Sequence, residues 1–299
     1  MKIVVTGSLG HISKPLTQEL LRDGHEVTVI SSRQERQKEI EALEAKAAIG
    51  SMTNADFLTE TFKGADAVYL MEAMAHNAFF DHELDLNATM NKIAYAYKQA
   101  VEQAGVKRVV HLSSIGAHTD TGNGMLVFHY NVEQILKLLP ADVAITTLRP
   151  VGFYYNIFGF IPTIKAQGAI VQNYGGDERE PWVSTNDIAH VAAEELQQHF
   201  EGRKVRYIAS DEVSPNGLAK ILGDAIGVPE LKWVAISDEE FENRLKAVGM
   251  SPQIAKGYTA MNAGRRDGLY IDYLQNRPVL SPTKLTDFAK DFAAAYNQK

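Results

Sequence analysis

Residues 2 to 14 read Lys-Ile-Val-Val-Thr-Gly-Ser-Leu-Gly-His-Ile-Ser-Lys, so that a short apolar run leads into a glycine turn. Gly7 can adopt the positive φ that a tight turn after a strand requires. Gly10 has no Cβ, so a pyrophosphate can approach the backbone at the N-terminus of the helix that follows. The stretch predicts a strand, a phosphate-binding turn and a helix, with Ser13 where a third glycine is usual. A strand, turn and helix without a ligand is the alternative.

The next residues complete a strand–helix–strand unit. Ile12, Leu16 and Leu20 form one apolar stripe, and Asp23-Gly24 is a typical helix end. Residues 25–30 alternate in polarity and are rich in β-branched side chains, which predicts a second strand. This order is that of a dinucleotide-binding fold, so we expect a nicotinamide dinucleotide as cofactor.

The residues after the second strand indicate which dinucleotide is bound. An NAD enzyme usually carries an acidic residue there, which accepts from the ribose 2′-hydroxyl. Here Ser31, Ser32 and Arg33 follow, and no carboxylate occurs before Glu35. Because a guanidinium and hydroxyls suit a 2′-phosphate, we predict NADP(H) in preference to NAD(H). The alternative is that Arg33 and Arg36 only solvate a surface helix, because residues 34–44 form a dense charged run.

Composition limits the possible functions. The chain has 299 residues, a net charge of −7 and no cysteine. A negative chain argues against direct nucleic-acid binding, and the lack of cysteine excludes disulfides, thiolate catalysis and zinc-thiolate sites. The nine histidines are scattered, so no metal site is expected. No apolar run is long enough to span a membrane and no secretory signal precedes the first strand, which predicts a cytoplasmic protein.

Strand and helix patterns continue to alternate. They predict strands at 47–50, 65–71, 106–112 and 143–148, helices at 56–62, 82–104, 185–195 and 283–296, a helix start at Ser237 and surface turns at 264–268 and 277–282. Ser113 and Ser114 follow the strand 106–112, at the edge of a parallel sheet where ligands bind. The fold class predicted is α/β, with a doubly wound parallel sheet of the Rossmann type.

An ordered set of motifs covers roughly the first two-thirds of the chain. The motifs are Thr6–Gly10, Phe62–Val68, Ala104–Ser114, His129–Glu133, Leu148–Asn156 and Trp182–Ala189. Together they resemble the NmrA-like group of atypical short-chain dehydrogenases/reductases. That group includes NADPH-dependent quinone oxidoreductases, triphenylmethane reductases, isoflavone-type reductases and a redox-sensing transcriptional regulator. The resemblance implies a dinucleotide domain over residues 1–156, to which residues around 182–210 return, and a smaller α/β substrate-side region over 157–299.

The chain departs from short-chain dehydrogenases at their proton-donating pair. Those enzymes use Tyr-x-x-x-Lys, in which the lysine lowers the tyrosine pKa. Alignment of this helix puts Met125 at the tyrosine position and His129 at the lysine position. Tyr130 is followed four residues later by Gln134, which cannot supply the cation. His129 could hold ribose or act as a weak acid, or it could simply be bonded within its helix.

Loss of the pair spares some reactions. A quinone or a cationic dye takes hydride into a delocalised system, whereas a ketone needs a proton at once. We therefore expect an NADPH-dependent reductase of a quinone or similar small acceptor. The alternative is a non-catalytic NADP(H) sensor that acts through a protein partner, and a homodimer is also possible; an epimerase would need the missing pair.

The resemblance and the motifs together give a set of candidate site residues. The predicted catalytic residues are His129 and Ser113. The predicted cofactor contacts are Gly7, Ser8, Leu9, Gly10, His11, Ile12, Ser31, Ser32, Arg33, Met71, Ser113, Ser114, His129, Pro150, Val151, Gly152 and Phe153. The predicted substrate pocket comprises Phe153, Tyr155, Asn156 and Trp182.

Overall fold

A seven-stranded parallel sheet forms the larger layer of the molecule, in the order β10-β6-β5-β4-β1-β2-β3. The computed structural model describes residues 1–74 and 77–298. The strands of this sheet are β1 (Lys2–Val5), β2 (Glu26–Ser31), β3 (Lys46–Ile49), β4 (Ala67–Leu70), β5 (Arg108–Leu112), β6 (Ala144–Pro150) and β10 (Arg203–Ile208). In β1, Ile3 is paired with Val27 on one side and with Ala67 on the other. The run of buried β-branched residues makes β1 a central strand.

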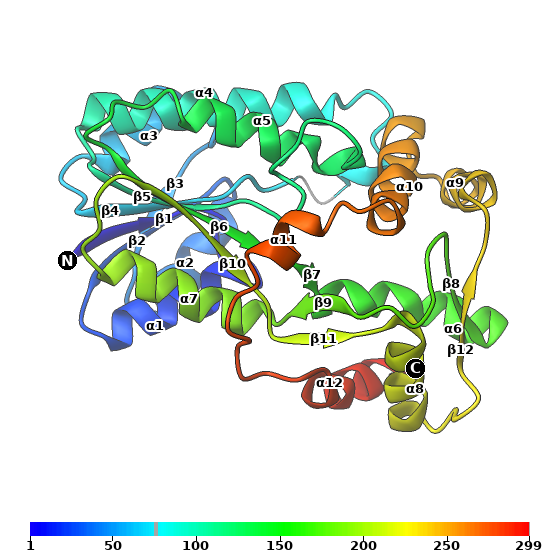
Figure 1. Cartoon of the computed structure of the whole chain (residues 1–299). Coiled ribbons are helices and arrows are strands. Elements are labelled where there is room, and N and C mark those ends of the chain that lie inside the picture. The colour runs from blue at the N-terminus through cyan, green and yellow to red at the C-terminus, as the bar shows by residue number, and fades with distance from the viewer. Residues whose placement is uncertain (75–76, 299) are drawn as a thin grey trace.

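Helices cover both faces of this sheet (Figure 1). One face carries α1 (Ser13–Arg22), α2 (Gln37–Glu41) and α7 (Thr185–Gln197), and the other carries α3 (Ala55–Phe62), α4 (Leu86–Ala104) and α5 (Val127–Leu136). Parallel strands need such crossover helices, which bury both faces of the sheet. The predicted α/β class with a doubly wound parallel sheet is confirmed.

Helix α4 begins later than the sequence pattern predicts. The pattern extended it from residue 82, whereas the helix starts at Leu86. Asp85 is the reason, because its side chain accepts a hydrogen bond from the Ala88 backbone N–H and so caps the first turn. The other end is as predicted, since Gly105 has φ +72° and closes the helix in the left-handed region.

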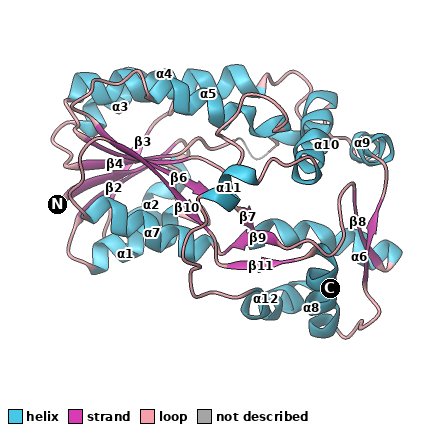
Figure 2. Ribbon diagram, in the orientation of Figure 1, coloured by secondary structure: helices cyan, strands magenta, loops and turns pink. Residues whose placement is uncertain are grey.

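The remaining elements form a second, smaller layer at the carboxyl end of the large sheet (Figure 2). They comprise a three-stranded sheet in the order β11-β9-β7 and a two-stranded sheet of β12 and β8. Their strands are β7 (Gly152–Phe153), β8 (Ala169–Gln172), β9 (Glu180–Val183), β11 (Asp211–Val213) and β12 (Lys232–Ala235). The helices here are η4 (Tyr154–Phe160), α6 (Ile161–Gln167), α8 (Pro215–Ile226), α9 (Asp238–Ala247), α10 (Pro252–Arg266), α11 (Ile271–Gln275) and α12 (Leu285–Asn297). The division at residue 156 remains a prediction.

Helix α10 corrects the prediction of a surface turn at residues 264–268. The helix continues through Gly264 and Arg265 and ends at Arg266. Gly264 is buried, and a Cβ there would collide with the Gly122 carbonyl oxygen. The glycine therefore serves close packing of the helix against a loop of the large layer and does not mark a turn.

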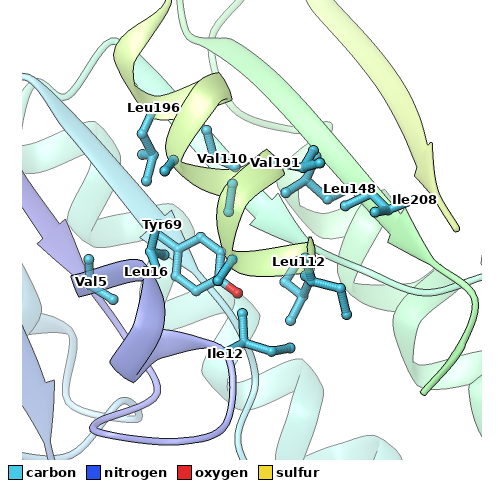
Figure 3. Close-up of a cluster of buried hydrophobic side chains, with 14 of the residues drawn as sticks. Val5, Ile12, Leu16, Tyr69, Val110, Leu112, Leu148, Val191, Leu196 and Ile208 are labelled. Atoms are coloured by element: carbon cyan, nitrogen blue, oxygen red, sulfur yellow. The ribbon is translucent and has the colours of Figure 1, made fainter. Parts of the chain in front are cut away.

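The core between the sheet and α1 and α7 is apolar (Figure 3). Val5, Leu16, Leu148 and Ile208 are all at most 2% exposed. Tyr69 of β4 lies in the same cluster, with its hydroxyl drawn between Ile12 and Leu112. Within residues 1–74 and 77–298, no helix has the length and apolar character needed to cross a membrane.

Candidate functional site

The strand order reverses between β1 and β4, which are neighbours in the sheet although two strands separate them in sequence. In an open α/β sheet, ligands bind outside the carboxyl ends of the strands at such a point. The chain leaves β1 there through Thr6 and Gly7, and it leaves β4 there through Met71 and Glu72. The reversal point therefore brings the predicted glycine turn next to the end of β4.

The glycine turn has the predicted backbone conformation. Gly7 has φ +88°, and a Cβ at this position would collide with the Met71 sulfur and the Ser13 hydroxyl. Ser13 donates to the Thr6 carbonyl oxygen at 2.9 Å, so it ties the start of α1 to the end of β1. Ser13 thus fills the place of the third glycine with a hydrogen bond. Ser8 also has a positive φ, of 56°, which the sequence did not indicate.

Other predicted cofactor residues of this turn differ in exposure. Leu9 is half-buried, Gly10 and His11 are exposed, and Ile12 belongs to the core. The tip of the turn is accordingly open to a ligand, while Ile12 anchors it. Met71 packs on Gly7 and its sulfur accepts a 3.5 Å hydrogen bond from Ser13.

The turn is linked to the end of β2 by hydroxyl groups. Ser8 Oγ donates to Ser31 Oγ at 3.0 Å, and Ser31 Oγ accepts from the Arg33 backbone N–H at 3.2 Å. The Arg33 side chain is 55% exposed, and its Nε lies 3.8 Å from a carboxylate oxygen of Glu35. Ser32 is exposed. The residues predicted to bind the 2′-phosphate therefore lie close together. The ion pair of Arg33 with Glu35 is long and exposed, so it holds the guanidinium only weakly.

A buried ionic network lies on the next strands. Ser113, directly after β5, donates to Glu133 of α5 at 2.6 Å, and Arg149 of β6 donates to both oxygens of Glu133 at 2.9 and 2.7 Å. Arg149 also contacts Asp272 of α11 at 3.2 Å, and Asp272 accepts from Tyr207 of β10. Burial alone would lower the pKa of Arg149, but its hydrogen bonds and the charge of Glu133 raise that pKa above its ordinary value.

Ser113 is a member of this network, and its catalytic role stays a prediction. The Ser113 side chain is buried, and its hydroxyl hydrogen is committed to Glu133. It has no further hydrogen to donate to a substrate. The geometry supports a structural role, in which Ser113 and Arg149 hold α5 against the sheet. Ser114 is half-buried and remains a predicted cofactor contact.

His129 lies one turn before Glu133 on α5. Burial, with the charge of His111 as the second cause, lowers the pKa of His129 to about 3. Its Nδ1 atom is buried and has no hydrogen-bond partner in the described part of the chain. The imidazole is consequently neutral at physiological pH, so it cannot replace the lysine cation of a Tyr-x-x-x-Lys pair.

Glu72 and His111 are two buried residues near this site that sequence reasoning missed. Glu72 follows β4, His111 lies in β5, and their Oε2 and Nε2 atoms are 3.3 Å apart with both side chains fully buried. Burial, with the Glu72 charge next, raises the pKa values of Tyr69 and Tyr97 above their ordinary range. Two features of the sequence could have indicated this buried pair. One is a single carboxylate directly after an apolar strand, and the other is a histidine within an apolar strand.

The loop after β6 approaches the glycine turn from the opposite side. Pro150 and Val151 are buried, Gly152 and Phe153 are half-buried in β7, and Tyr155 and Asn156 are exposed. The Tyr155 ring lies on the His11 ring, with the centroids 3.8 Å apart and a 33° angle between the planes. The predicted cofactor turn and the predicted substrate loop are therefore in direct contact.

Trp182 does not lie where a pocket residue would. The side chain is 2% exposed, and its indole N–H donates to the Val213 carbonyl oxygen at 3.3 Å. Its ring lies under Gly152, where a Cβ would come within 3.2 Å of it. The prediction that Trp182 lines the substrate pocket is corrected, because the residue supports the loop from behind.

Over residues 1–74 and 77–298, no group of three or more His, Asp and Glu side chains is placed to hold a metal ion.

Comparison with known proteins agrees with the fold and the glycine turn. Residues 7–199 match the model of a protein family described as NAD(P)H-binding. The chain belongs to this family. The match starts at Gly7, just after β1, and extends from α1 through β4 to α7.

Solved structures give the same fold at low sequence identity. An NADPH-dependent quinone oxidoreductase from Escherichia coli, in complex with NADPH, is 19% identical, with a TM-score of 0.79 over 97% of this chain and 99% of that one. The triphenylmethane reductase of Citrobacter sp. is 20% identical, with a TM-score of 0.76 over 97% and 99%. A nucleoside-diphosphate-sugar epimerase from Staphylococcus aureus is 19% identical, with a TM-score of 0.74 over 97% and 100%. The predicted resemblance to NmrA-like atypical short-chain dehydrogenases/reductases is confirmed at the level of the fold, and the family is NAD(P)H-binding.

A curated relative matches a shorter segment. Sterol demethylase protein B of Methylococcus capsulatus is 28% identical over 134 residues, which are 44% of this chain. The match spans 40% of the length of that relative, so its activity says little about the present chain.

Proposed function

We propose that the protein is an NADPH-dependent reductase that transfers a hydride to a quinone or a similar electron-poor acceptor. The choice of cofactor rests on the contacts that join Ser8, Ser31 and Arg33. It also rests on the lack of an acidic residue between the end of β2 and Glu35. A guanidinium and hydroxyl groups recognise a phosphate, whereas an NAD site favours an acid on the ribose. NADP(H) is therefore the proposed cofactor.

The residues present fit such a cofactor. Gly7 lies where any Cβ would collide, and the exposed Gly10 leaves the N-terminus of α1 open to a diphosphate. Ser31 and Arg33 would hold the 2′-phosphate, and Gly152 and Phe153 would border the nicotinamide. When bound, the cofactor supplies the hydride.

The proposed acceptor class rests on the missing cation at the lysine position of the Tyr-x-x-x-Lys pair. His129 is neutral and cannot activate a phenol, so the chain has no cation at the lysine position of the usual pair. Electron-poor acceptors need less proton donation than ketones do. Phe153 and Tyr155 offer aromatic surface to a flat molecule. We propose a small-molecule acceptor, a cytoplasmic location and no direct nucleic-acid partner.

The deciding experiment mixes purified protein and NADPH with a panel of quinones, cationic dyes, enals, simple ketones and secondary alcohols (the last with NADP⁺), and follows NADPH absorbance without added flavin or metal. We expect quinones to oxidise NADPH and ketones and alcohols to react negligibly. The Phe153→Ala variant should mainly raise KM for the quinone. If no acceptor reacts, but NADPH and NADP⁺ alter the affinity for a protein partner, the protein is a redox sensor and the reductase proposal is wrong.

A further inference from the structure

Strand β10 forms one edge of the seven-stranded sheet, and β6 is its only neighbour in the described part of the chain. The Gly202 carbonyl oxygen accepts from the Ile145 N–H at 2.9 Å, and the Ile208 carbonyl oxygen accepts from the Val151 N–H at 3.2 Å. Successive residues of a strand direct their backbone groups to opposite sides, so the even-numbered residues face β6. The odd-numbered residues of β10 therefore point their N–H and C=O groups away from the sheet.

These outward-facing residues are Arg203, Val205 and Tyr207. Over residues 1–74 and 77–298, no loop backbone bonds to their N–H and C=O groups. Val205 is 50% exposed, although it is an apolar residue of a sheet strand. The other edge strand, β3, has four residues, whereas β10 has six. Because unpaired backbone groups on a strand are a template for a further strand, β10 is the edge that can extend this sheet.

A cavity of about 770 Å³ lies along the carboxyl half of this edge. It is lined by the consecutive residues 205–208 of β10 and, on its other side, by Ser281 and residues 275–279, which lead from α11 towards α12 (Figure 1). Neighbouring strand residues point to opposite faces of a sheet, so a cavity lined by four in a row surrounds the edge itself. At the amino end of the strand, Arg203 and Lys204 are exposed.

We propose that β10 pairs with β10 of a second copy of this chain, antiparallel, across a two-fold axis at Val205. In this register Val205 lies opposite the same residue of the second copy, and Arg203 lies opposite Tyr207. The outward-facing residues of the two strands then exchange N–H···O=C bonds in both directions. The exposed amino half of each strand enters the cavity beside the carboxyl half of the other. One surface thus serves both copies, as a two-fold contact requires.

The charges of the strand are compatible with this pairing. Lys204 lies opposite Arg206 of the second copy, and like charges in such positions destabilise a sheet. Each cation is balanced within its own copy, because Lys204 lies 2.6 Å from Glu195, and Arg206 lies 2.9 Å from Glu194 and 3.0 Å from Glu195. At the axis, the two Val205 side chains remove each other's apolar surface from water.

The lack of cysteine in the chain permits a direct test of this register. Residues opposite each other in a hydrogen-bonded antiparallel pair have Cα atoms about 5.5 Å apart, which suits a disulfide. Val205→Cys should therefore form a disulfide-linked dimer under mild oxidation, as seen on a non-reducing denaturing gel. Lys46→Cys is the matched control, because Lys46 is exposed on the other edge strand, β3, and this variant should stay mainly monomeric.

The oligomeric state tests the pairing without a cross-link. In sedimentation experiments the wild type should have about twice the 33.0 kDa mass of one chain. Val205→Pro should be monomeric, because it removes an N–H at the axis that β6 does not use. Val205→Glu should also be monomeric, because it places two carboxylates opposite each other. Val205→Thr keeps the N–H and the branched shape, so it should remain dimeric.

A monomeric wild type would overturn the proposal and leave the edge to an extended segment of another protein. Val205→Cys that cross-links no more than Lys46→Cys would contradict the register and the proposal with it. A dimer that survives Val205→Glu would lie on another surface, which also excludes this pairing. If circular dichroism shows that Val205→Pro does not fold, Val205→Glu decides the question in the same way.

Discussion

Arg33 is the exposed side chain that we propose selects the cofactor. Its backbone N–H is held by Ser31, while its guanidinium is 55% exposed and lies 3.8 Å from Glu35. An ion pair of this length and exposure contributes little to stability, so the guanidinium can turn to a phosphate at small cost. The neighbouring Arg36 differs, because it is paired with Glu39 at 2.5 Å.

The Arg33→Ala variant should lose much of its preference for NADPH over NADH. A lost charge-assisted contact costs about 1–3 kcal/mol, which corresponds to about a 5- to 150-fold weaker binding of NADPH. NADH affinity should stay the same. Calorimetric titration with both cofactors measures this, with Arg36→Ala as the control. Equal affinities of the wild type for NADPH and NADH would contradict the assignment.

His129 should make the folded state sensitive to acid. Its pKa is about 3 in the folded protein against 6.5 for the free group, so the unfolded chain binds the proton first as pH falls. The free energy of unfolding therefore decreases below pH 6.5, by up to about 1.4 kcal/mol per pH unit from this group. Urea unfolding at pH 7 and pH 5 should show a smaller decrease for His129→Gln than for the wild type. The control is His190→Gln, which removes an exposed histidine and should show the same decrease as the wild type. If His129→Gln also loses as much free energy of unfolding between pH 7 and pH 5 as the wild type, His129 is not the group responsible.

At the scale of elements, one carboxylate holds four of them together. Glu133 of α5 binds Ser113 after β5 and Arg149 of β6, and Arg149 reaches Asp272 of α11. The network fixes α5, and with it His129, against the carboxyl edge of the sheet. It also joins the large layer to α11, which follows the long helix α10.

The Glu133→Gln variant should be strongly destabilised. It leaves the Arg149 guanidinium buried with only part of its charge compensated, and breaking such a pair costs about 3–5 kcal/mol. Asp142→Asn is the control, because the Lys107–Asp142 pair is as short, at 2.6 Å, but exposed on the surface. That substitution should leave the free energy of unfolding nearly unchanged. Denaturant unfolding of both variants measures the difference, and similar losses would contradict this view of Glu133.

At the scale of the whole molecule, the proposed cofactor site lies where two layers meet. The glycine turn belongs to the large layer and Tyr155 to the small one, and the His11–Tyr155 contact joins them. A ligand that binds only the folded chain at this junction stabilises the whole fold by mass action. Its binding is therefore visible in the unfolding transition.

NADPH at 100 times its Kd should stabilise the wild type by about 2.7 kcal/mol, which raises Tm by several degrees. The Gly10→Val variant should show no such rise, because its side chain points at the diphosphate position. Its own Tm should fall only slightly, since a Cβ at Gly10 meets nothing closer than the Gly7 carbonyl oxygen at 3.2 Å. Thermal melts with and without NADPH test this. An equal rise in both proteins would mean that the glycine turn does not bind the cofactor.

The sequence alone determined the elements that depend on neighbours along the chain. A glycine with positive φ, an apolar stripe and a β-branched run are local, and they correctly predicted β1, the turn at Gly7 and α1. Only the tertiary structure decided which side chains meet. Glu72 and His111 are 39 residues apart, and Glu133 and Arg149 are 16 apart, yet parallel strand pairing brings each pair to one sheet edge. Burial is likewise non-local, which is why Trp182 and Gly264 appeared to belong to a pocket and a turn until the packing of β9 and α10 placed both in the interior.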